Sequence, residues 1–160
     1  MTQQVTFLGL GVMGYPMARH LHNAGFETHV FNRTMQKSQD WVNSQNIISS
    51  RLHVHVASAV KHANIVCMCL GNDNDVRSVV YGDSGVLANM PAGSVLIDHT
   101  TGSQMLALEL YAACQEKGIG FIDAPVSGGQ AGAENGQLTI MCGGDVDTYH
   151  KVDEVLNAYS

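Results

Sequence analysis

The length of 160 residues suits one folded domain, with enough interior to be stable without disulfides or metals. Hydrophobic residues make up 45% of the chain and charged residues only 14%, which argues against a disordered chain and against a long, solvated helix bundle. The net charge of -6 and the 8 Lys and Arg residues argue against a nucleic-acid-binding protein. The sequence shows no long apolar run and no signal-peptide pattern, so neither a membrane-spanning nor a secreted protein is expected.

Short apolar runs alternate with stretches of helical spacing along the whole chain. Residues 64–70 form a continuous apolar run, typical of a strand that is covered on both faces. The pattern predicts strands over residues 5–8, 28–31, 52–56, 64–70, 94–98, 119–122 and 138–142. It predicts helices over residues 13–24, 36–44, 58–62, 76–80, 103–117 and 146–158.

Strands and helices in alternation are typical of a parallel sheet with helices on both faces. The sequence therefore predicts a single α/β domain, residues 1–160, built on a doubly wound, mostly parallel sheet. Two regions interrupt the alternation of strands and helices. Residues 45–51 are polar and are expected to form a loop, and residues 127–136 are rich in glycine.

A glycine motif follows the first predicted strand and opens the first predicted helix. It fits G-x-G-x-x-G in the strand–turn–helix context that a dinucleotide site requires, and its residues are Gly9, Leu10, Gly11, Val12, Met13 and Gly14. Gly9 allows the tight turn, Gly11 lets the backbone approach a pyrophosphate, and Gly14 lets the helix pack closely on the sheet. The helix N-terminus then offers free N–H groups to the phosphates. The motif predicts a Rossmann-type nucleotide site, and a glycine-rich turn without a ligand is the alternative.

The end of the second predicted strand indicates which dinucleotide is bound. An NAD site places an acidic residue there for the ribose hydroxyls, and this chain has Asn32, Arg33 and Thr34 instead. Arg33 offers a planar, permanent cation to a 2′-phosphate, Thr34 offers a hydroxyl, and Lys37 lies one helical turn further on. We therefore predict NADP(H) as the preferred cofactor, with NAD(H) as the second option. A solvated Arg33 without a ligand is the structural alternative.

Five segments resemble the β-hydroxyacid dehydrogenase family, which includes 3-hydroxyisobutyrate dehydrogenases, semialdehyde reductases and 6-phosphogluconate dehydrogenases. They occur in family order and cover almost the whole chain, and the segment DAPVSGG is far more specific than the glycine motif. The segment NRT is more similar to the NADP-using semialdehyde reductases than to the NAD-using 3-hydroxyisobutyrate branch. The five segments are residues 7–14 (FLGLGVMG), 32–34 (NRT), 98–101 (DHTT), 123–129 (DAPVSGG) and 138–144 (LTIMCGG).

The resemblance implies roles for further residues. Residues 127–129 (Ser127, Gly128 and Gly129) match the segment of the family that holds the substrate carboxylate, and their hydroxyl and unhindered backbone N–H groups suit an anion. Residues 70–72 (Leu70, Gly71 and Asn72) match the loop that borders the cofactor, and Thr101 matches the residue near the nicotinamide ribose.

The resemblance also implies a hydride transfer between the nicotinamide and the C3 carbon of a small 3-hydroxy acid or its semialdehyde or keto acid. The family's proton donor is a Lys in a following helical domain, and no lysine here has that context. We therefore assign no catalytic residue to this chain, expect the helical domain to be absent from it, and expect the chain alone to be inactive. The expected partners are a small carboxylate substrate and, with the helical domain present, a second copy. A non-catalytic NADP(H)-binding module and an imine reductase of the same superfamily are the alternatives.

The histidines and cysteines give weaker signals. His53 and His55 alternate along a predicted strand and would face one side, but two histidines without a third ligand make a poor zinc site, so no metal is expected. His99, at the end of a predicted strand, is a minor alternative as a general acid. Cys67 and Cys69 lie in an apolar run and are expected to be small buried side chains of a reduced, cytoplasmic protein.

Overall fold

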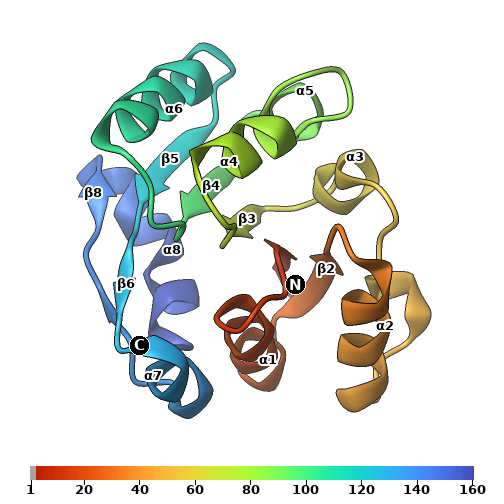
Figure 1. Ribbon diagram of the computed structural model, residues 1–160. Coiled ribbons are helices and arrows are strands. Elements are labelled where there is room, and N and C mark those ends of the chain that lie inside the picture. Colours follow the sequence, from red (N-terminus) through yellow and green to blue (C-terminus); the bar gives the residue numbers. More distant parts are fainter. Residues whose placement is uncertain (1–2) are drawn as a thin grey trace.

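Strands and helices alternate through residues 3–160, which are the part of the chain that the computed structural model describes (Figure 1). The strands are β1 (Gln4–Leu8), β2 (Glu27–Phe31), β3 (Ile65–Met68), β4 (Val95–Asp98), β5 (Gly120–Asp123), β6 (Val126–Ser127), β7 (Thr139–Ile140) and β8 (Gly143–Gly144). The helices are α1 (Gly14–Asn23), α2 (Met35–Ser44), α3 (Val56–Val60), α4 (Asp73–Val80), α5 (Val86–Asn89), α6 (Gln104–Glu116), α7 (Gly129–Asn135) and α8 (Val146–Asn157), with a 3-10 turn at Ser49–Arg51. Within this described range, no helix has the length and apolar character needed to cross a bilayer.

The main sheet of residues 3–160 has the strand order β2-β1-β3-β4-β5-β8, and β6 pairs with β7 in a small separate sheet. Strands β1 to β5 pair in parallel, and the short β8 joins β5 in the antiparallel direction. The chain passes from β1 to β2 on one side and then crosses to β3 on the other, so the strand order reverses at β1. In such sheets the ligand crevice lies at the carboxyl ends of the strands beside the reversal, here β1 and β3. The predicted doubly wound, mostly parallel sheet is confirmed.

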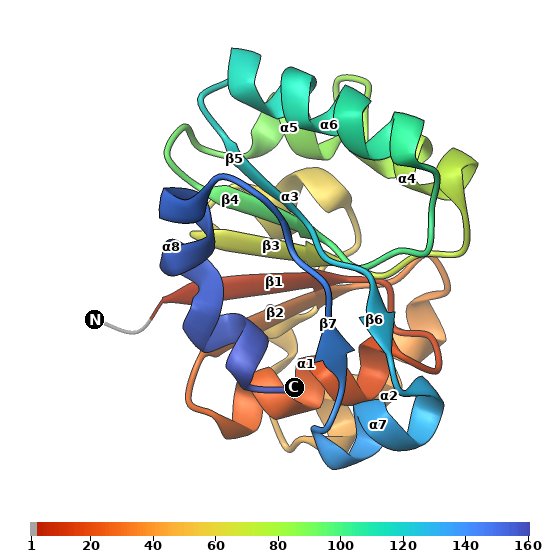
Figure 2. The same ribbon diagram turned by 90° about the vertical axis from the view of Figure 1, so that its left-hand side faces the viewer.

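Side chains that alternate along β1 contribute to two cores, one on each face of the sheet. Val5 and Phe7 belong to the core that includes residues of α1, α2 and α8, whereas Leu8 belongs to the core that includes residues of α3, α4 and α6. Figure 2 shows α4, α5 and α6 on one side of the strands and α1, α2 and α7 on the other. Burial on both faces fixes the strand ends that carry the site.

The predicted strand over residues 52–56 is wrong. Leu52 makes one isolated parallel bridge to β2, and the chain then turns into α3. The alternation of His and Val produces no buried face here, because Val54 is 61% exposed. The shared strand face expected for the two histidines therefore does not exist. His53 instead lies against His29 of β2, with 2.8 Å between its Nε2 and the Nδ1 of His29.

The glycine-rich region at residues 127–136 is regular structure. It holds the end of β6 and the whole of α7, which terminates at Gly136 with a φ of 64°. Of the strand predicted over residues 138–142, only β7 is extended, and it pairs with β6. The next strand, β8, begins after the predicted range and joins the edge of the main sheet. The sequence pattern does not indicate that β7 and β8 pair with different sheets, because the pairing of such short strands depends on contacts with distant segments. The short helix α5 also has no counterpart in the predicted pattern.

Candidate dinucleotide site

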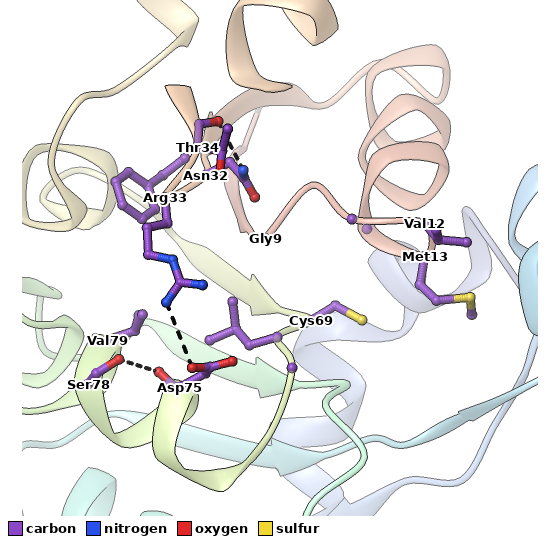
Figure 3. A pocket seen from close by; sticks show the side chains of 15 residues that line it. Gly9, Val12, Met13, Asn32, Arg33, Thr34, Cys69, Asp75, Ser78 and Val79 are labelled. Atoms are coloured by element: carbon purple, nitrogen blue, oxygen red, sulfur yellow. Dashed lines mark hydrogen bonds and ion pairs between the residues drawn. The ribbon is translucent and has the colours of Figure 1, made fainter. Parts of the chain in front are cut away.

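A cavity of about 400 Å³ lies at the carboxyl ends of β1, β2 and β3, in the crevice that the strand order indicates. Figure 3 shows the glycine turn, the loop after β2 and the start of α4 around it. Most predicted cofactor residues line it, namely Gly9, Gly11, Val12, Met13, Gly14, Asn32, Arg33, Thr34, Leu70 and Gly71. The others lie outside this lining, namely Leu10, Lys37, Asn72 and Thr101.

The glycine turn between β1 and α1 has the geometry that the motif predicts. Gly9 has a φ of 99°, which side chains disfavour, and a Cβ there would collide with the Cys69 carbonyl. A Cβ at Gly14 would collide with the Gly9 carbonyl and the Phe7 ring, so α1 packs directly on β1. A Cβ at Gly11 would meet no atom of residues 3–160 within 4 Å. The backbone at Gly11 is therefore open to an approaching ligand.

The N-terminus of α1 offers unpaired donors beside the cavity. No acceptor in the described part of the chain pairs with the backbone N–H groups of Val12 and Met13, which line the cavity. Within residues 3–160, the first turn of this ten-residue helix carries no acidic residue, and its N-cap residue Met13 makes no side-chain capping hydrogen bond. Open N–H groups at the positive end of a helix dipole suit a phosphate. These residues therefore fit the pyrophosphate of a dinucleotide.

Asn32 joins the glycine turn to the loop after β2. Its Oδ1 accepts a hydrogen bond from the Leu10 N–H at 2.8 Å, and its Nδ2 donates to the Thr34 carbonyl at 3.0 Å. The side chain of Leu10 is fully buried, so Leu10 contributes to the site through this backbone link. The Asn32 amide thereby holds two sides of the crevice at a fixed separation.

The two predicted phosphate-binding cations lie in different surroundings. The Arg33 side chain is 88% exposed and extends across the mouth of the cavity toward α4, where its Nη1 lies 3.9 Å from Asp75 Oδ1 (Figure 3). Thr34 lies beside it at the start of α2. Lys37 is exposed on α2, outside the cavity lining. Arg33 is thus the predicted cation that the structure places at the cavity.

The first two turns of α4 form a wall of the cavity that the sequence motifs do not indicate. Asp75, Ser78 and Val79 line it, together with Phe31 and Cys69 at the strand ends. Their spacing along α4 is i, i+3 and i+4, which is one face of a helix. That spacing is the signal that could have identified them, once the loop after β3 had been assigned to the cofactor.

The loop after β3 is tied to the loop after β4. The Leu70 N–H donates to Thr100 Oγ1 at 2.9 Å, and Thr100 is buried. Asn72 caps α4 through its side chain, so its amide oxygen is committed to the helix. Thr101, which the resemblance places near the nicotinamide ribose, is exposed in the loop after β4. These contacts hold the predicted nicotinamide end of the crevice.

The segment matched to the substrate carboxylate spans the end of β6 and the start of α7. Ser127, Gly128 and Gly129 are exposed, and the two glycines have φ values of 131° and 61°. The other end of α7 is held by α1, because His20 Nε2 lies 2.9 and 3.0 Å from two carbonyl oxygens in the last turn of α7. Helix α1 therefore connects the glycine turn with the predicted substrate segment.

His99 is a core residue, and the alternative role of a general acid is wrong. Its buried ring places Nδ1 2.7 Å from the Ala124 carbonyl oxygen and Nε2 2.7 Å from the Tyr159 hydroxyl. Because a carbonyl only accepts, Nδ1 carries the proton and Nε2 accepts from Tyr159. Burial lowers the pKa of His99 to about 4, so the ring is neutral at pH 7. The ring thus links the end of β4 to Ala124, which follows β5, and to Tyr159, which follows α8.

Burial also shifts two ionisable groups near the strand ends. It raises the pKa of the Cys69 thiol, in the cavity lining, to about 11, so this thiol is protonated at neutral pH. It raises the pKa of the Asp98 carboxyl to about 6, although the Thr100 N–H donates to that carboxyl at 3.0 Å. Cys69 is therefore a poor nucleophile at neutral pH.

Comparison with known proteins agrees with this geometry. The family model for the NAD-binding domain of 6-phosphogluconate dehydrogenase matches residues 4–160. The chain belongs to this family. A curated relative, an uncharacterized oxidoreductase of Shewanella frigidimarina, is 46% identical over 157 residues, which cover 98% of this chain and 53% of that protein. The chain thus spans about half the length of the curated relatives it matches.

Two solved structures show the same fold. The 3-hydroxyisobutyrate dehydrogenase of Mycobacterium tuberculosis, with L-serine, has a TM-score of 0.90 and 31% identity, over 100% of this chain and 53% of that one. Psf3 in complex with NADP+ and 2-OPP has a TM-score of 0.90 and 28% identity, over 97% of this chain and 54% of that one. The predicted resemblance and the Rossmann-type fold are confirmed, and the chain is an NAD(P)-binding domain of an oxidoreductase family.

Proposed function

We propose that this chain is the NADP(H)-binding part of an oxidoreductase that interconverts a small 3-hydroxy acid and its semialdehyde or keto acid. The observation that carries the cofactor preference is the position of Arg33 at the cavity mouth, after β2, where an NAD site places a carboxylate. A permanent, planar cation suits a 2′-phosphate, and Thr34 adds a hydroxyl beside it. NAD(H) is the second option for the same cavity.

Each part of the crevice has a role in this proposal. The open N–H groups of the glycine turn bind the pyrophosphate, Arg33 and Thr34 bind the 2′-phosphate, and the loops after β3 and β4 border the nicotinamide half. The bound cofactor supplies the hydride. Residues 127–129 hold the substrate carboxylate through a hydroxyl and backbone N–H groups. The proton donor is a Lys of a helical domain outside this chain, and that domain also forms the homo-oligomer, in the cytoplasm.

Dinucleotide binding by an Arg33→Ala variant tests the cofactor assignment. Loss of a charge-assisted contact should weaken NADPH binding roughly 10- to 100-fold in titration calorimetry. NADH binding should change less than about threefold, because NADH has no phosphate at that position. Lys61→Ala removes the same charge from an exposed position outside the cavity and serves as the control. Equal losses for NADPH and NADH in Arg33→Ala would contradict the assignment.

A hydride-transfer assay tests whether the proton donor lies outside this cofactor-binding domain. NADPH oxidation is measured with succinic semialdehyde or glyoxylate, for this chain alone and for a longer version that includes a helical domain. We expect turnover only in the longer version, because the proposed donor lies outside residues 1–160. Turnover by the 160-residue chain alone would overturn that placement. NADPH binding without turnover in the longer version would favour a non-catalytic binding module.

A further inference from the structure

A carboxylate from α4 lies opposite Arg33 at the cavity. Asp75, in the first turn of α4, places its Oδ1 3.9 Å from Arg33 Nη1, across the mouth that Figure 3 shows. Among the lining residues within the described range 3–160, Arg33 and Asp75 are the only ones with a charged side chain. The cavity that is proposed to take a 2′-phosphate therefore holds one cation and one anion.

Hydrogen bonds fix the backbone of Asp75 at the start of α4, beside Gly71. Its backbone N–H donates to Asn72 Oδ1 at 2.9 Å, and its carbonyl accepts from Ser78 Oγ at 2.8 Å. The carboxyl group lies over Gly71, where a Cβ would come 2.5 Å from Asp75 Oδ2. The missing side chain at Gly71 thus leaves the room that the carboxylate occupies beside the cavity.

A phosphate bound to Arg33 would face this carboxylate. Two like charges separated by about 6–8 Å near a protein surface, screened by physiological salt, change a binding constant by about three- to tenfold. The pair between Arg33 and Asp75 itself is exposed and long, so breaking it costs little. A dinucleotide without the 2′-phosphate brings no charge to this position, so the carboxylate leaves its affinity unchanged.

We propose that Asp75 is a specificity-determining residue of the dinucleotide site, whose carboxylate, seated over Gly71, weakens binding of the 2′-phosphorylated cofactor. Arg33 favours the phosphate and Asp75 opposes it, so the preference for NADP(H) over NAD(H) is smaller than Arg33 alone would produce. The inference rests on the proposed function, since it concerns the cavity assigned there to the dinucleotide.

The test compares NADPH and NADH binding to the wild-type chain and to Asp75→Asn by titration calorimetry. Asparagine keeps the shape and removes the charge, so NADPH should bind about three- to tenfold more tightly and NADH within about twofold of wild type. The gain should shrink in high salt, because exposed charges are screened. Asp147→Asn removes the same charge from the exposed surface of α8 and should change neither constant.

A second variant changes the position of the Asp75 carboxylate through a substitution at Gly71, the residue that it lies over. Gly71→Ala displaces Asp75 Oδ2 and should also shift the ratio of the two binding constants toward NADPH, with urea unfolding as the check that the variant folds. An unchanged ratio in Asp75→Asn would overturn the inference and leave the proposed function intact. A selective loss of NADH binding would also overturn it, because Asp75 would then be a ribose ligand. A wild-type chain that binds neither dinucleotide would overturn the proposed function and this inference with it.

Discussion

The neutral, buried ring of His99 should make a contribution to stability that is lost in acid. The pKa of His99 is about 4 in the folded chain, against 6.5 for an ordinary histidine, because the ring is buried. A histidine whose pKa is lowered by folding leaves stability intact above the unfolded pKa and reduces it as the pH falls through 6.5 toward 4. The gap between the two pKa values corresponds to about 3 kcal/mol of unfolding free energy at pH 4.

The His99→Gln variant isolates this contribution. Glutamine does not titrate and can still bond the Ala124 carbonyl and the Tyr159 hydroxyl. Urea unfolding at pH 7.5, 6, 5 and 4 is measured for both proteins, since the wild type alone is not sufficient. Burial raises the folded pKa of Asp98 to about 6, so that carboxyl adds stability as the pH falls and opposes the effect of His99. The difference between the two proteins cancels the Asp98 contribution.

The expected result is a change of sign. At pH 7.5 the wild type should be more stable than His99→Gln by about 1–2 kcal/mol, from better packing and hydrogen bonds. At pH 4 the variant should be more stable by a similar amount, because it has no ring to protonate. A stability difference that stays constant over this pH range would refute the reasoning.

Other predictions follow from the glycine turn and its supports. Gly14→Ala should lower the free energy of unfolding in urea by about 2–3 kcal/mol. Gly11→Ala should change this free energy by less than about 0.5 kcal/mol but weaken the binding of both NADPH and NADH in calorimetry. Similar unfolding curves for the two variants would contradict the turn geometry. Asn32→Ala leaves the Leu10 N–H without its acceptor and should cost about 1–3 kcal/mol, with equal weakening of NADPH and NADH; a loss confined to NADPH would instead make Asn32 a phosphate ligand. His20→Ala should speed amide hydrogen exchange across α7 and not across α2, and unchanged exchange in α7 would count against the link from α1.

The parts of the site that depend on local sequence were predictable. A turn with a φ of 99° at Gly9 and a helix packed against that turn at Gly14 require glycine, so the motif carries the geometry directly. The end of a parallel strand lies at the ligand edge of the sheet, which is why Arg33 was placed correctly from its position after β2.

The parts that depend on distant contacts were not predictable. The segment from Leu52 to Val56 alternates as a strand does, but the only strand pairing it makes in the described part of the chain is the bridge from Leu52 to β2. His99 sits at a strand end that faces the ligand edge, yet its ring turns into the core because the Ala124 carbonyl and Tyr159 hydroxyl pair with both nitrogens. Asp75 lies on a helix opposite Arg33 through tertiary packing alone, and no motif marks it.

Backbone amide NMR during titration with NADPH tests most directly the central claim that the crevice at the ends of β1, β2 and β3 binds a phosphorylated dinucleotide. The account predicts that the largest shift changes fall on Val12, Met13, Arg33 and Thr34, and that the ³¹P resonance of the 2′-phosphate moves in the wild type and not in Arg33→Ala. Changes confined to surfaces away from this crevice, or none at millimolar NADPH, would contradict it.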